Sequence, residues 1–328
     1  MRLMIYEPAY KRVAERLAPY AGQLELLLVD VEGHITCNGA TFDTDTAEPE
    51  AGWMAADGGG GAGGRALAIS LLKSPRLTWV HTGAAGVDNP IWGQLVGKGA
   101  KLSTGHGQAI SIAEYVLAEV LGRFQRLAER RAEQAAHRWT RLPFREIAGT
   151  RWLVIGFGAI GQGVAERARA FGAHITAVRR AVAPHPLADA MAPLAGVRTL
   201  LPEADVVVLA TPLNDETRGM ADAAFFAAMR PGSVLVNIGR GDLVDEAALL
   251  AALDVGVPDY AILDVFRAEP LPEDSPFWAH PKVAMTPHAS AFGSGQAARN
   301  DALFLENLRR RLAGEPLLYE ADPRDLGR

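Results

Sequence analysis

The segment that most limits the fold of this chain is Gly156-Phe157-Gly158-Ala159-Ile160-Gly161. It follows the apolar run 152–155 and precedes a stretch with helical spacing, so it joins a strand to a helix. In this setting the first glycine permits a tight turn, the second lets the backbone approach a pyrophosphate, and the third lets the helix pack closely on the strand. The helix N-terminus then faces the anion. The segment therefore predicts a dinucleotide site formed by Gly156, Gly158, Ala159, Ile160 and Gly161.

Short apolar runs alternate with helical patterns along most of the chain. The first hundred residues contain three such runs, at 3–6, 24–29 and 77–80, with helical patterns at 11–17 and 65–72. Six later runs continue the alternation: 152–155, 174–178, 206–210, 234–238, 261–265 and 283–285. Strand and helix in strict succession predict parallel, doubly wound sheets. Since 328 residues exceed one typical domain, we expect an α/β fold of two such domains with a cleft between them.

Two helical patterns indicate where the domains begin and end. Residues 108–139 contain no proline, and their apolar residues recur at helical spacing, which predicts one long helix linking the domains. Residues 296–312 form a helix after the second series of strands, and we expect it to pack back on the first domain. The first, substrate-binding domain would then comprise residues 1–104 and 291–328. Residues 105–290 would be the inserted nucleotide-binding domain.

Composition excludes several classes of protein. A formal net charge of −5 provides no concentrated basic surface, so we expect neither a nucleic-acid nor a membrane partner. Cys37 is the only cysteine, so no intrachain disulfide can form. The opening segment is too short in apolar length for a signal peptide, and no run of about 18 apolar residues occurs. We expect a cytoplasmic protein, with the glycine-rich stretch 58–64 as a mobile surface loop.

The strand after the glycine loop ends at Arg179-Arg180. Enzymes that bind NAD usually carry an acidic residue here, which binds the ribose 2′-hydroxyl. A carboxylate would repel a 2′-phosphate, whereas a guanidinium binds it with a charge-assisted contact. We therefore predict a preference for NADPH, with Arg179 and Arg180 on the phosphate and NAD as the alternative coenzyme. The competing interpretation is a solvated pair of arginines.

Three later segments each follow a predicted strand of the second domain, at the edge where ligands bind in open α/β folds. They are Asn237-Ile238-Gly239-Arg240-Gly241, Asp264-Val265-Phe266 with Glu269-Pro270 behind it, and Thr286-Pro287-His288-Ala289-Ser290. In order and approximate spacing they match one family: the chain resembles the D-isomer-specific 2-hydroxyacid dehydrogenases, and among them the glyoxylate and hydroxypyruvate reductases. Thr211-Pro212-Leu213 resembles the family's coenzyme loop, and Gly83-Ala84-Ala85-Gly86-Val87-Asp88 resembles its substrate-carboxylate loop.

The resemblance implies an oxidoreductase that uses NADPH to convert a small 2-oxo acid to a D-2-hydroxy acid. It also implies a Rossmann nucleotide domain and a flavodoxin-like substrate domain. The implied catalytic residues are Arg240, Glu269 and His288. The further implied coenzyme contacts are Thr211, Pro212, Ile238, Gly239, Arg240, Asp264 and His288. The implied substrate contacts are Ala84, Ala85, Gly86, Val87, Arg240 and His288, and we expect no metal ion.

Carbonyl reduction explains these residue types. Hydride that reaches the carbonyl carbon leaves negative charge on oxygen, so a proton donor and a cation are needed there. Histidine can supply and remove a proton near neutral pH. Glu269 would orient the His288 ring and favour its charged form, and Arg240 would hold the substrate carboxylate with two hydrogen bonds. The competing interpretations are a loop cap for His288, a surface charge for Glu269, a salt bridge for Arg240 and a turn cap for Asp264.

Other features leave alternatives open. Many family members have histidine where this chain has Tyr115, a departure that could alter the interdomain or subunit surface. Trp92, Trp139 and Trp278 are expected to be packing residues. A coenzyme-sensing corepressor of the same fold, or a dehydrogenase for formate or phosphite, remains an alternative function. From the resemblance we expect a homodimer joined through the nucleotide domain and the long helix.

Overall fold

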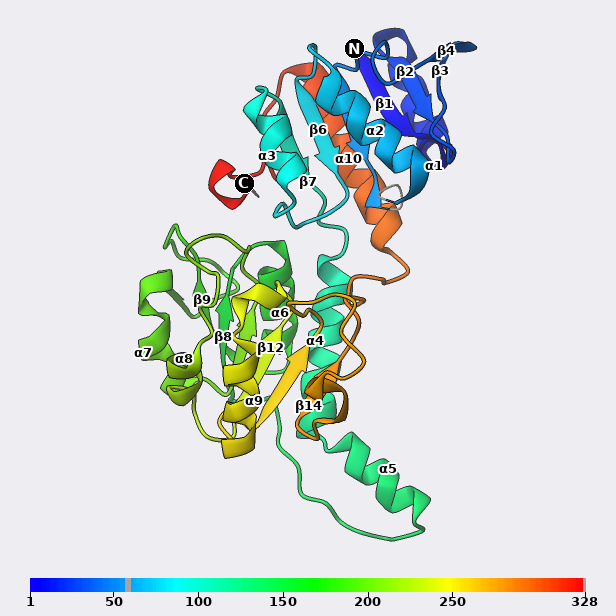
Figure 1. Ribbon diagram of the computed structural model, residues 1–328. Coiled ribbons are helices and arrows are strands. Elements are labelled where there is room, and N and C mark those ends of the chain that lie inside the picture. The colour runs from blue at the N-terminus through cyan, green and yellow to red at the C-terminus, as the bar shows by residue number, and fades with distance from the viewer. Residues whose placement is uncertain (57–59, 327–328) are drawn as a thin grey trace. The chain divides into compact units, whose positions relative to one another are not determined.

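The computed structural model describes residues 1–56 and 60–326. The chain forms two compact units, Met1–Gln108 with Ser294–Arg328 and Ala109–Gly293 (Figure 1). The second unit is thus inserted into the first along the chain. Each unit contains one seven-stranded sheet. The architecture is the pair of α/β domains that the alternation of strands and helices predicted.

The sheet of the first unit has the strand order β4-β3-β2-β1-β5-β6-β7. Five of these strands are parallel: β1 Arg2–Tyr6, β2 Glu25–Val29, β5 Ala51–Met54, β6 Trp79–Thr82 and β7 Lys101–Thr104. Counted among themselves they run 2-1-3-4-5, which is the predicted flavodoxin-like order. The helices of this unit are α1 Glu7–Leu17, α2 Gly61–Lys73, α3 Pro90–Gly97 and α10 Gln296–Ala313.

An antiparallel hairpin, β3 Ile35–Cys37 and β4 Ala40–Phe42, extends the sheet beyond β2. The sequence pattern used above did not predict it. Asn38 and Gly39 form the two-residue connection, with φ of 48° and 81°. Two successive positive φ angles are what a primed hairpin turn requires, and Asn-Gly is the dipeptide that adopts them most readily. The Asn-Gly pair was therefore the signal that identifies this edge.

The glycine-rich stretch corrects one sequence prediction. Gly58 and Gly59 lie outside the described residues, but Gly61–Lys73 is helix α2, so the later glycines do not form a loop. The amide of Gly63 donates to the carbonyl oxygen of Val31 at 3.2 Å. A Cβ at Gly63 would lie 2.2 Å from the carbonyl oxygen of Asp30. Glycine is required here because the helix begins in direct contact with the backbone that follows β2.

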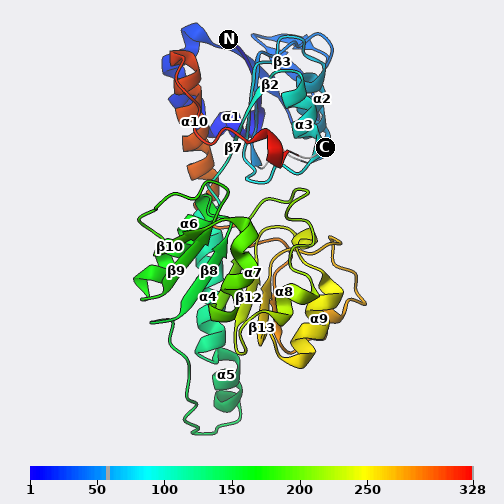
Figure 2. The same cartoon turned by 90° about the vertical axis from the view of Figure 1, so that its left-hand side faces the viewer.

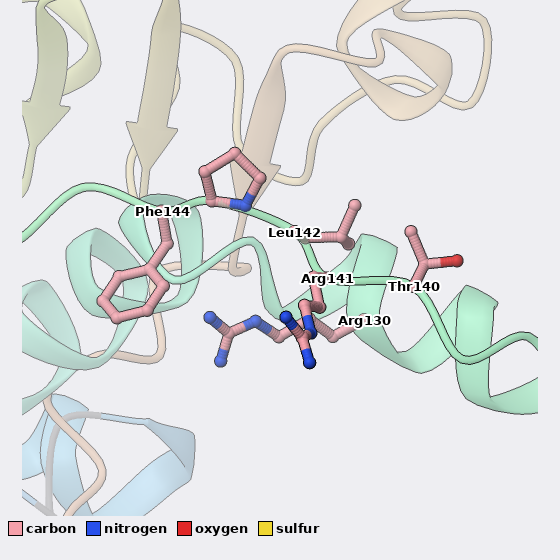
Figure 3. Close-up of a pocket in the computed structure, with 6 residues that line it drawn as sticks. Arg130, Thr140, Arg141, Leu142 and Phe144 are labelled. Carbon is pink, nitrogen blue, oxygen red and sulfur yellow. The ribbon is translucent and has the colours of Figure 1, made fainter.

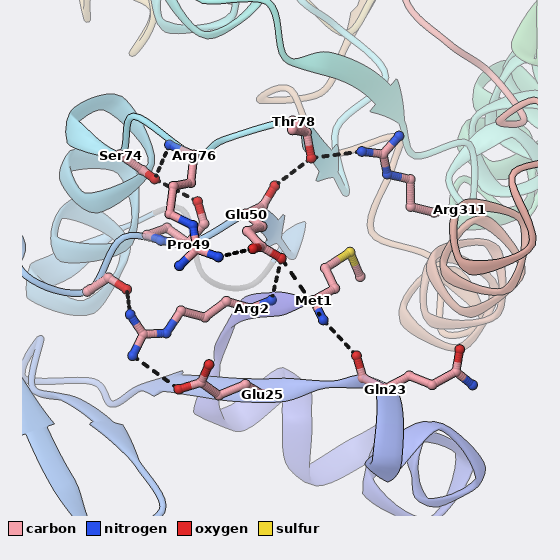
Figure 4. A network of polar contacts seen from close by, with 11 residues as sticks. Met1, Arg2, Gln23, Glu25, Pro49, Glu50, Ser74, Arg76, Thr78 and Arg311 are labelled. Atoms are coloured by element: carbon pink, nitrogen blue, oxygen red, sulfur yellow. Dashed lines mark hydrogen bonds and ion pairs between the residues drawn. The ribbon is translucent and has the colours of Figure 1, made fainter.

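A polar network closes the edge of this sheet at which the parallel strands begin (Figure 4). The Glu50 carboxylate, directly before β5, accepts a hydrogen bond from the Arg2 amide at 3.0 Å and pairs with the Arg76 guanidinium. Its backbone carbonyl accepts from the Thr78 hydroxyl at 3.0 Å, and that hydroxyl accepts from Arg311 of α10 at 2.8 Å. The Arg2 amide and the Arg76 charge hold the pKa of Glu50 below its usual range. These contacts are structural, and they leave the opposite strand ends for the candidate site.

Helix α10 packs on the first unit through its aromatic face. Phe304, fully buried, stacks on Trp53 of β5 with ring centroids 3.9 Å apart and on Trp79 of β6 at 6.0 Å. Asp301 of the same helix forms an ion pair with Arg12 of α1, with nitrogen–oxygen distances of 2.9 and 3.0 Å. The last helix of the chain therefore belongs to the same unit as its first hundred residues.

The sheet of the second unit has the order β10-β9-β8-β11-β12-β13-β14, and every pairing is parallel. Its strands are β8 Arg151–Ile155, β9 His174–Val178, β10 Ala190–Ala192, β11 Val206–Leu209, β12 Val234–Asn237, β13 Tyr260–Leu263 and β14 Val283–Met285. This is the Rossmann order, which reverses direction between β8 and β11. Because ligands of such sheets bind where the order reverses, the glycine loop after β8 lies at the expected place.

Helices cover both faces of this sheet. They are α4 Ala109–Phe124, α5 Leu127–Ala135, α6 Ala159–Ala170, α7 Val197–Leu200, α8 Ala223–Ala227 and α9 Glu246–Val255. Trp152 and Val154 of β8 belong to a hydrophobic layer shared with α4 and α6, whereas Leu153 and Ile155 face a second layer shared with α8 and α9. Figure 2 shows these two pairs of helices on opposite sides of the sheet. A strand buried on both faces explains the continuous apolar runs in the sequence.

The predicted single helix over residues 108–139 is wrong. It is divided into α4 and α5 at Arg126, which has φ 56° and ψ 44°. Helix α4 buries one face against the sheet, but α5 has no buried residue, so tertiary packing supports only the first of the two. In the described part of the chain, no helix combines the length and apolar character needed to cross a membrane.

Two of the three tryptophans predicted to pack do not. Trp92 is 7% exposed, in agreement with the prediction, but Trp139 is 97% exposed and Trp278 is 54% exposed. Trp139 lies outside the helices and strands, and Trp278 lies in the short 3-10 helix Pro276–Ala279. Packing in the hydrophobic core of this chain therefore does not explain why tryptophan occurs at these two positions.

Candidate active site

The three glycines of the nucleotide loop each have a distinct structural role. Gly156 ends β8 with φ +96°, and a Cβ there would lie 2.4 Å from the backbone of Ala210. A Cβ at Gly161 would lie 2.1 Å from the carbonyl oxygen of Gly156, so helix and loop touch through backbone. Gly158 differs, because nothing lies within 4 Å of the position of its Cβ. The open side of the loop is therefore at Gly158, where α6 begins without a side-chain cap and where a pyrophosphate would approach.

Arg179 and Arg180 lie at the same sheet edge as this loop. Ile155 and Val178 are direct partners in the β8–β9 pairing, and the Gly156 amide donates to the carbonyl oxygen of Val178 at 3.0 Å. Both arginines are exposed. The position that usually carries an acidic residue is thus cationic and exposed.

The loops after β11 and β12 are shaped by side chains that the sequence interpretation did not single out. The buried Thr217 hydroxyl donates to the carbonyl oxygen of Pro212 at 2.7 Å and folds the loop that carries Thr211. After β12, buried Asn237 accepts from the Gly239 amide at 3.1 Å and donates to the carbonyl oxygen of Arg240 at 2.9 Å. Their burial is seen only in the structure, so no local sequence pattern would have found either role.

Arg240 lies in a tightly packed turn next to the end of β13. One of its guanidinium nitrogens donates to the carbonyl oxygen of Gly239 at 2.7 Å. A Cβ at Gly241 would lie 1.9 Å from the backbone carbon of Phe266. The turn therefore runs directly against the segment that leads to Glu269.

Glu269 and His288 form the central pair of the site. The His288 Nδ1 lies 2.8 Å from one carboxylate oxygen of Glu269, and the other oxygen accepts from the Phe266 amide at 3.0 Å. The two side chains are 46% and 38% exposed, so the pair is accessible to a substrate. His288 has φ 51°, and its amide donates to the carbonyl oxygen of Asp264 at 2.8 Å. With Nδ1 directed at the carboxylate, Nε2 is the ring atom that can exchange a proton.

Asp264 anchors the loop that carries His288. Its carboxylate is 2% exposed and accepts from the Thr286 hydroxyl at 2.7 Å and from the amides of Ala289 and Ser290 at 2.8 and 3.0 Å. It also accepts from the Ser290 hydroxyl. These contacts join Asp264 to the loop after β14 and not to the turn that follows Asp264 itself. Contact with a nicotinamide remains a prediction.

Tyr115 is partly buried, and the described part of the chain offers its hydroxyl no hydrogen-bond partner. It lies on α4 and packs against the hydrophobic layer formed with α6. Burial raises the pKa of its phenol, with smaller influences from Thr286 and Asp264. The residue that replaces the family's histidine is therefore a neutral, largely buried group in the second unit.

The predicted substrate-carboxylate loop follows β6 in the first unit. The Ala84 amide donates to the Thr82 hydroxyl at 3.1 Å. The next three amides, of Ala85, Gly86 and Val87, donate to no group within residues 1–56 and 60–326. Three successive backbone amides without a partner are the kind of group that binds an anion such as a carboxylate.

Comparisons with known proteins agree with these assignments at the level of a family. Residues 117–290 match the family model described as "D-isomer specific 2-hydroxyacid dehydrogenase, NAD binding domain". This match covers more than half of the chain and includes the glycine loop, Arg240, Glu269 and His288. A nicotinamide dinucleotide is therefore the coenzyme class of the second unit.

Individual relatives differ in the reaction that their names state. The chain is 37% identical over 248 residues to a D-3-phosphoglycerate dehydrogenase of Mycobacterium leprae, which covers 75% of this chain but 47% of that protein. The chain thus spans about half the length of that relative. It is 32% identical over 307 residues to glyoxylate/hydroxypyruvate reductase B of Escherichia fergusonii, covering 88% of this chain and 92% of the relative. A D-isomer specific 2-hydroxyacid dehydrogenase from Xanthobacter autotrophicus Py2, solved with NADPH and MES, has a TM-score of 0.79 at 27% identity and 98% coverage of both chains.

Proposed function

The chain belongs to the D-isomer specific 2-hydroxyacid dehydrogenase family, and we propose that it reduces a small 2-oxo acid to the D-2-hydroxy acid with NADPH as coenzyme. One observation carries the proposal. His288 and Glu269, which follow the neighbouring strands β14 and β13, are joined by a hydrogen bond of 2.8 Å. An oriented imidazole at a sheet edge that also carries a dinucleotide loop is what carbonyl reduction requires.

In this mechanism His288 is the general acid in reduction and the general base in oxidation. Its Nδ1–H donates to Glu269, which fixes the orientation of the ring. In reduction Nε2–H donates to the carbonyl oxygen as that oxygen gains negative charge, and in oxidation neutral Nε2 accepts the proton of the hydroxyl group. When bound, the nicotinamide coenzyme supplies hydride for reduction and accepts it in oxidation.

The guanidinium of Arg240 and a set of backbone amides are proposed to bind the carboxylate of the substrate. Arg240 is proposed to bind the substrate carboxylate and to place positive charge near the carbonyl oxygen, because a guanidinium offers several donors in one plane. The amides of Ala85, Gly86 and Val87, in the first unit, are proposed to bind a substrate carboxylate. Their lack of other partners in the described chain supports this role. Glyoxylate and hydroxypyruvate are the first substrates to test, since a relative of similar length is named for them.

The preference for NADPH rests on Arg179 and Arg180. Both are exposed at the carboxyl end of β9, beside the glycine loop. A guanidinium at this place favours a 2′-phosphate over a 2′-hydroxyl. The ratio of kcat/KM for NADPH to kcat/KM for NADH measures the preference.

The function is tested by following NADPH oxidation with a panel of 2-oxo acids. The panel contains glyoxylate, hydroxypyruvate, pyruvate, 2-oxogluconate, phenylpyruvate and 3-phosphohydroxypyruvate. We expect turnover of at least one of them, and we expect His288→Ala to lose roughly 100-fold or more in kcat because general acid–base catalysis contributes about 10²–10⁴. NADPH binding to this variant is expected to be unchanged. His174→Ala, an exposed histidine where β9 begins, is the matched control and is expected to keep wild-type turnover. Wild-type turnover by His288→Ala would refute the proton role.

We also propose that the protein is a homodimer that covers the arm at residues 125–145. Helix α5 has no buried residue, Trp139 is 97% exposed, and Phe144 is 49% exposed. Figure 3 shows Phe144 beside a pocket into which the Arg130 and Arg141 side chains extend, and the Arg130 guanidinium lies 4.8 Å from the Phe144 ring centroid. Large apolar side chains gathered on an otherwise uncovered arm are typical of a subunit interface.

Sedimentation velocity tests the dimer. We expect the wild-type chain to sediment as a dimer and the double variant Trp139→Lys, Phe144→Lys to sediment as a monomer. Val255→Lys, which changes an 84% exposed apolar residue at the end of α9, is the control and is expected to leave the dimer intact. A wild-type monomer would refute the proposal.

A further inference from the structure

A buried asparagine of α10 contacts two loops of the first unit. Asn300 is 4% exposed. Its side-chain oxygen accepts from the Gly107 amide at 2.7 Å, and its side-chain nitrogen donates to the carbonyl oxygen of Gly83 at 3.2 Å. Gly83 begins the proposed substrate-carboxylate loop, and Gly107 follows β7. One side chain therefore satisfies a backbone donor in one loop and a backbone acceptor in the other.

The surroundings of Asn300 leave no room for another arrangement. A Cβ at Gly107 would lie 2.6 Å from the Asn300 oxygen, and a Cβ at Gly105 would lie 2.5 Å from the carbonyl oxygen of Gly83. The Gly105 amide also donates to the carbonyl oxygen of Ala84 at 3.0 Å. The two loops thus touch through backbone atoms, and the asparagine fills the space between them. Its position is set by packing as well as by hydrogen bonds.

The contact with Gly83 bears directly on the amides that follow. The carbonyl of Gly83 and the amide of Ala84 belong to one planar peptide group, so fixing one fixes the direction of the other. Asn300 holds the carbonyl side, and the Thr82 hydroxyl holds the amide side at 3.1 Å. The next three amides, of Ala85, Gly86 and Val87, have no partner in the described chain. The direction in which they point is therefore set by a peptide group held at both ends.

We propose that Asn300 is a positioning residue for the 2-oxo acid carboxylate: it fixes the Gly83 peptide so that the amides of Ala85, Gly86 and Val87 converge on one anion. This inference rests on the proposed function for the identity of the anion. A neutral amide suits the task because a carboxylate at the same place would face the Gly83 carbonyl oxygen with a second acceptor and would repel the substrate. The same helix carries Asn307, which is fully buried and makes the same pair of bonds to Leu318, at 3.1 and 2.7 Å. Leu318 belongs to a different segment from the loop, so Asn307 is a matched structural control.

The test compares Asn300→Asp with Asn307→Asp in the full-length protein. For the best 2-oxo acid of the panel we expect Asn300→Asp to raise KM by about tenfold or more. We expect kcat to change by less than about threefold, because the variant weakens carboxylate binding equally in the ground state and in the transition state. NADPH binding is expected to be unchanged. Asn307→Asp is expected to lower Tm about as much as Asn300→Asp does, while its KM stays at the wild-type value. Thr82→Val, which frees the other side of the same peptide, is expected to raise KM as Asn300→Asp does. An unchanged KM in Asn300→Asp, or an equal rise in Asn307→Asp, would overturn the proposal.

A binding measurement separates this proposal from the proposed function. Oxamate, a carboxylate that is not reduced, is titrated into the NADPH complex of each variant by calorimetry. If the wild type turns over no 2-oxo acid but binds oxamate, the proposed reaction fails, and a loss of oxamate affinity confined to Asn300→Asp and Thr82→Val still supports the positioning role. Equal oxamate affinity in all variants, or no oxamate binding by the wild type, would overturn it.

Discussion

The two units hold their functional loops with different chemical groups. In the second unit, the buried carboxylate of Asp264 accepts hydrogen bonds from four donors of the loop that carries His288. In the first unit, the neutral amide of Asn300 gives one hydrogen bond and accepts one, and the loop keeps three amides without partners in the described chain. The loop that carries His288, in the second unit, is rich in donors directed at Asp264, so an anionic side chain of the protein satisfies them. If the loop of the first unit binds an anionic substrate as proposed, a protein carboxylate nearby would compete with that substrate.

This difference predicts that changes to the two anchors will affect different kinetic constants. A displaced His288 impairs proton transfer, which appears in kcat. A displaced carboxylate loop impairs substrate binding, which appears in KM. Three sets of variants test how far the comparison extends.

The largest effect is expected for Asp264→Asn. The amide retains the shape of the side chain but replaces one acceptor oxygen with a donor that faces other donors. Hydrogen bonds to a buried charged group are worth about 1.5–3 kcal/mol, and each 1.4 kcal/mol is about tenfold in rate, so we expect kcat to fall roughly 10–100-fold. Steady-state kinetics with the best 2-oxo acid measure this. Asp301→Asn, which breaks a buried ion pair with Arg12 in the first unit, is the control and is expected to lower Tm while kcat is retained. Equal losses of kcat in both variants would contradict a specific role for Asp264.

The two glycine-rich helix starts give the next comparison. Gly63 of α2 meets backbone, since a Cβ would lie 2.2 Å from the carbonyl oxygen of Asp30, whereas Gly158 before α6 has nothing within 4 Å of that position. We expect Gly63→Ala to lower the free energy of unfolding by about 1–3 kcal/mol through overpacking, with no change in coenzyme affinity. Gly158→Ala is expected to keep the unfolding free energy within about 0.5 kcal/mol of wild type and to weaken NADPH binding. Chemical denaturation and fluorescence titration measure the two quantities, and a coenzyme defect in Gly63→Ala would break the distinction.

The smallest effect is expected at the coenzyme's cationic site. Replacing Arg179 and Arg180 together with alanine removes the proposed contacts of the 2′-phosphate in the second unit. Because charge-assisted bonds at exposed positions are weakened by solvent, we expect the NADPH-to-NADH ratio of kcat/KM to fall by about tenfold, with activity toward the 2-oxo acid retained when NADH is used. Arg151→Ala, an exposed arginine where β8 begins, is expected to leave the ratio unchanged. An undiminished preference in the double variant would remove these residues from the assignment.

Much of the fold was predictable because burial leaves a local signature in the sequence. Strands that are covered on both faces consist of continuous apolar residues, and β9 and β14 were predicted with the bounds that the structure has. The break at Arg126 and the exposure of Trp139 were not predictable in this way, because helical spacing does not show whether another surface is present to cover the helix. The Asn38-Gly39 hairpin was detectable, since its signal is the turn itself.

The residues of the candidate site likewise fall into those that the sequence predicted and those that only the structure revealed. Gly156 could be identified from the sequence because its loop joins a strand to a helix. Glu269 and His288 were predicted from the resemblance of their segments, each of which follows a strand, to those of the family. The roles of Thr217 and Asn237 were missed, since a polar residue in a loop or at a strand end has no distinguishing local pattern. Asp264 was identified but not its partners, which lie on the loop after the neighbouring strand β14.

The sequence by itself determined the parallel sheet of the second unit, the dinucleotide loop and the segments that carry Glu269 and His288, because each of these depends on residues that are close together along the chain. Only the tertiary structure decided which groups hold the functional loops in place. Asn300 meets Gly107 across 193 residues and Gly83 across 217, and the inserted second unit lies between them along the chain. A hydrogen bond needs its partners about 3 Å apart in space and places no condition on their separation in sequence, so the pairing of an amide with two distant loops leaves no local pattern to find.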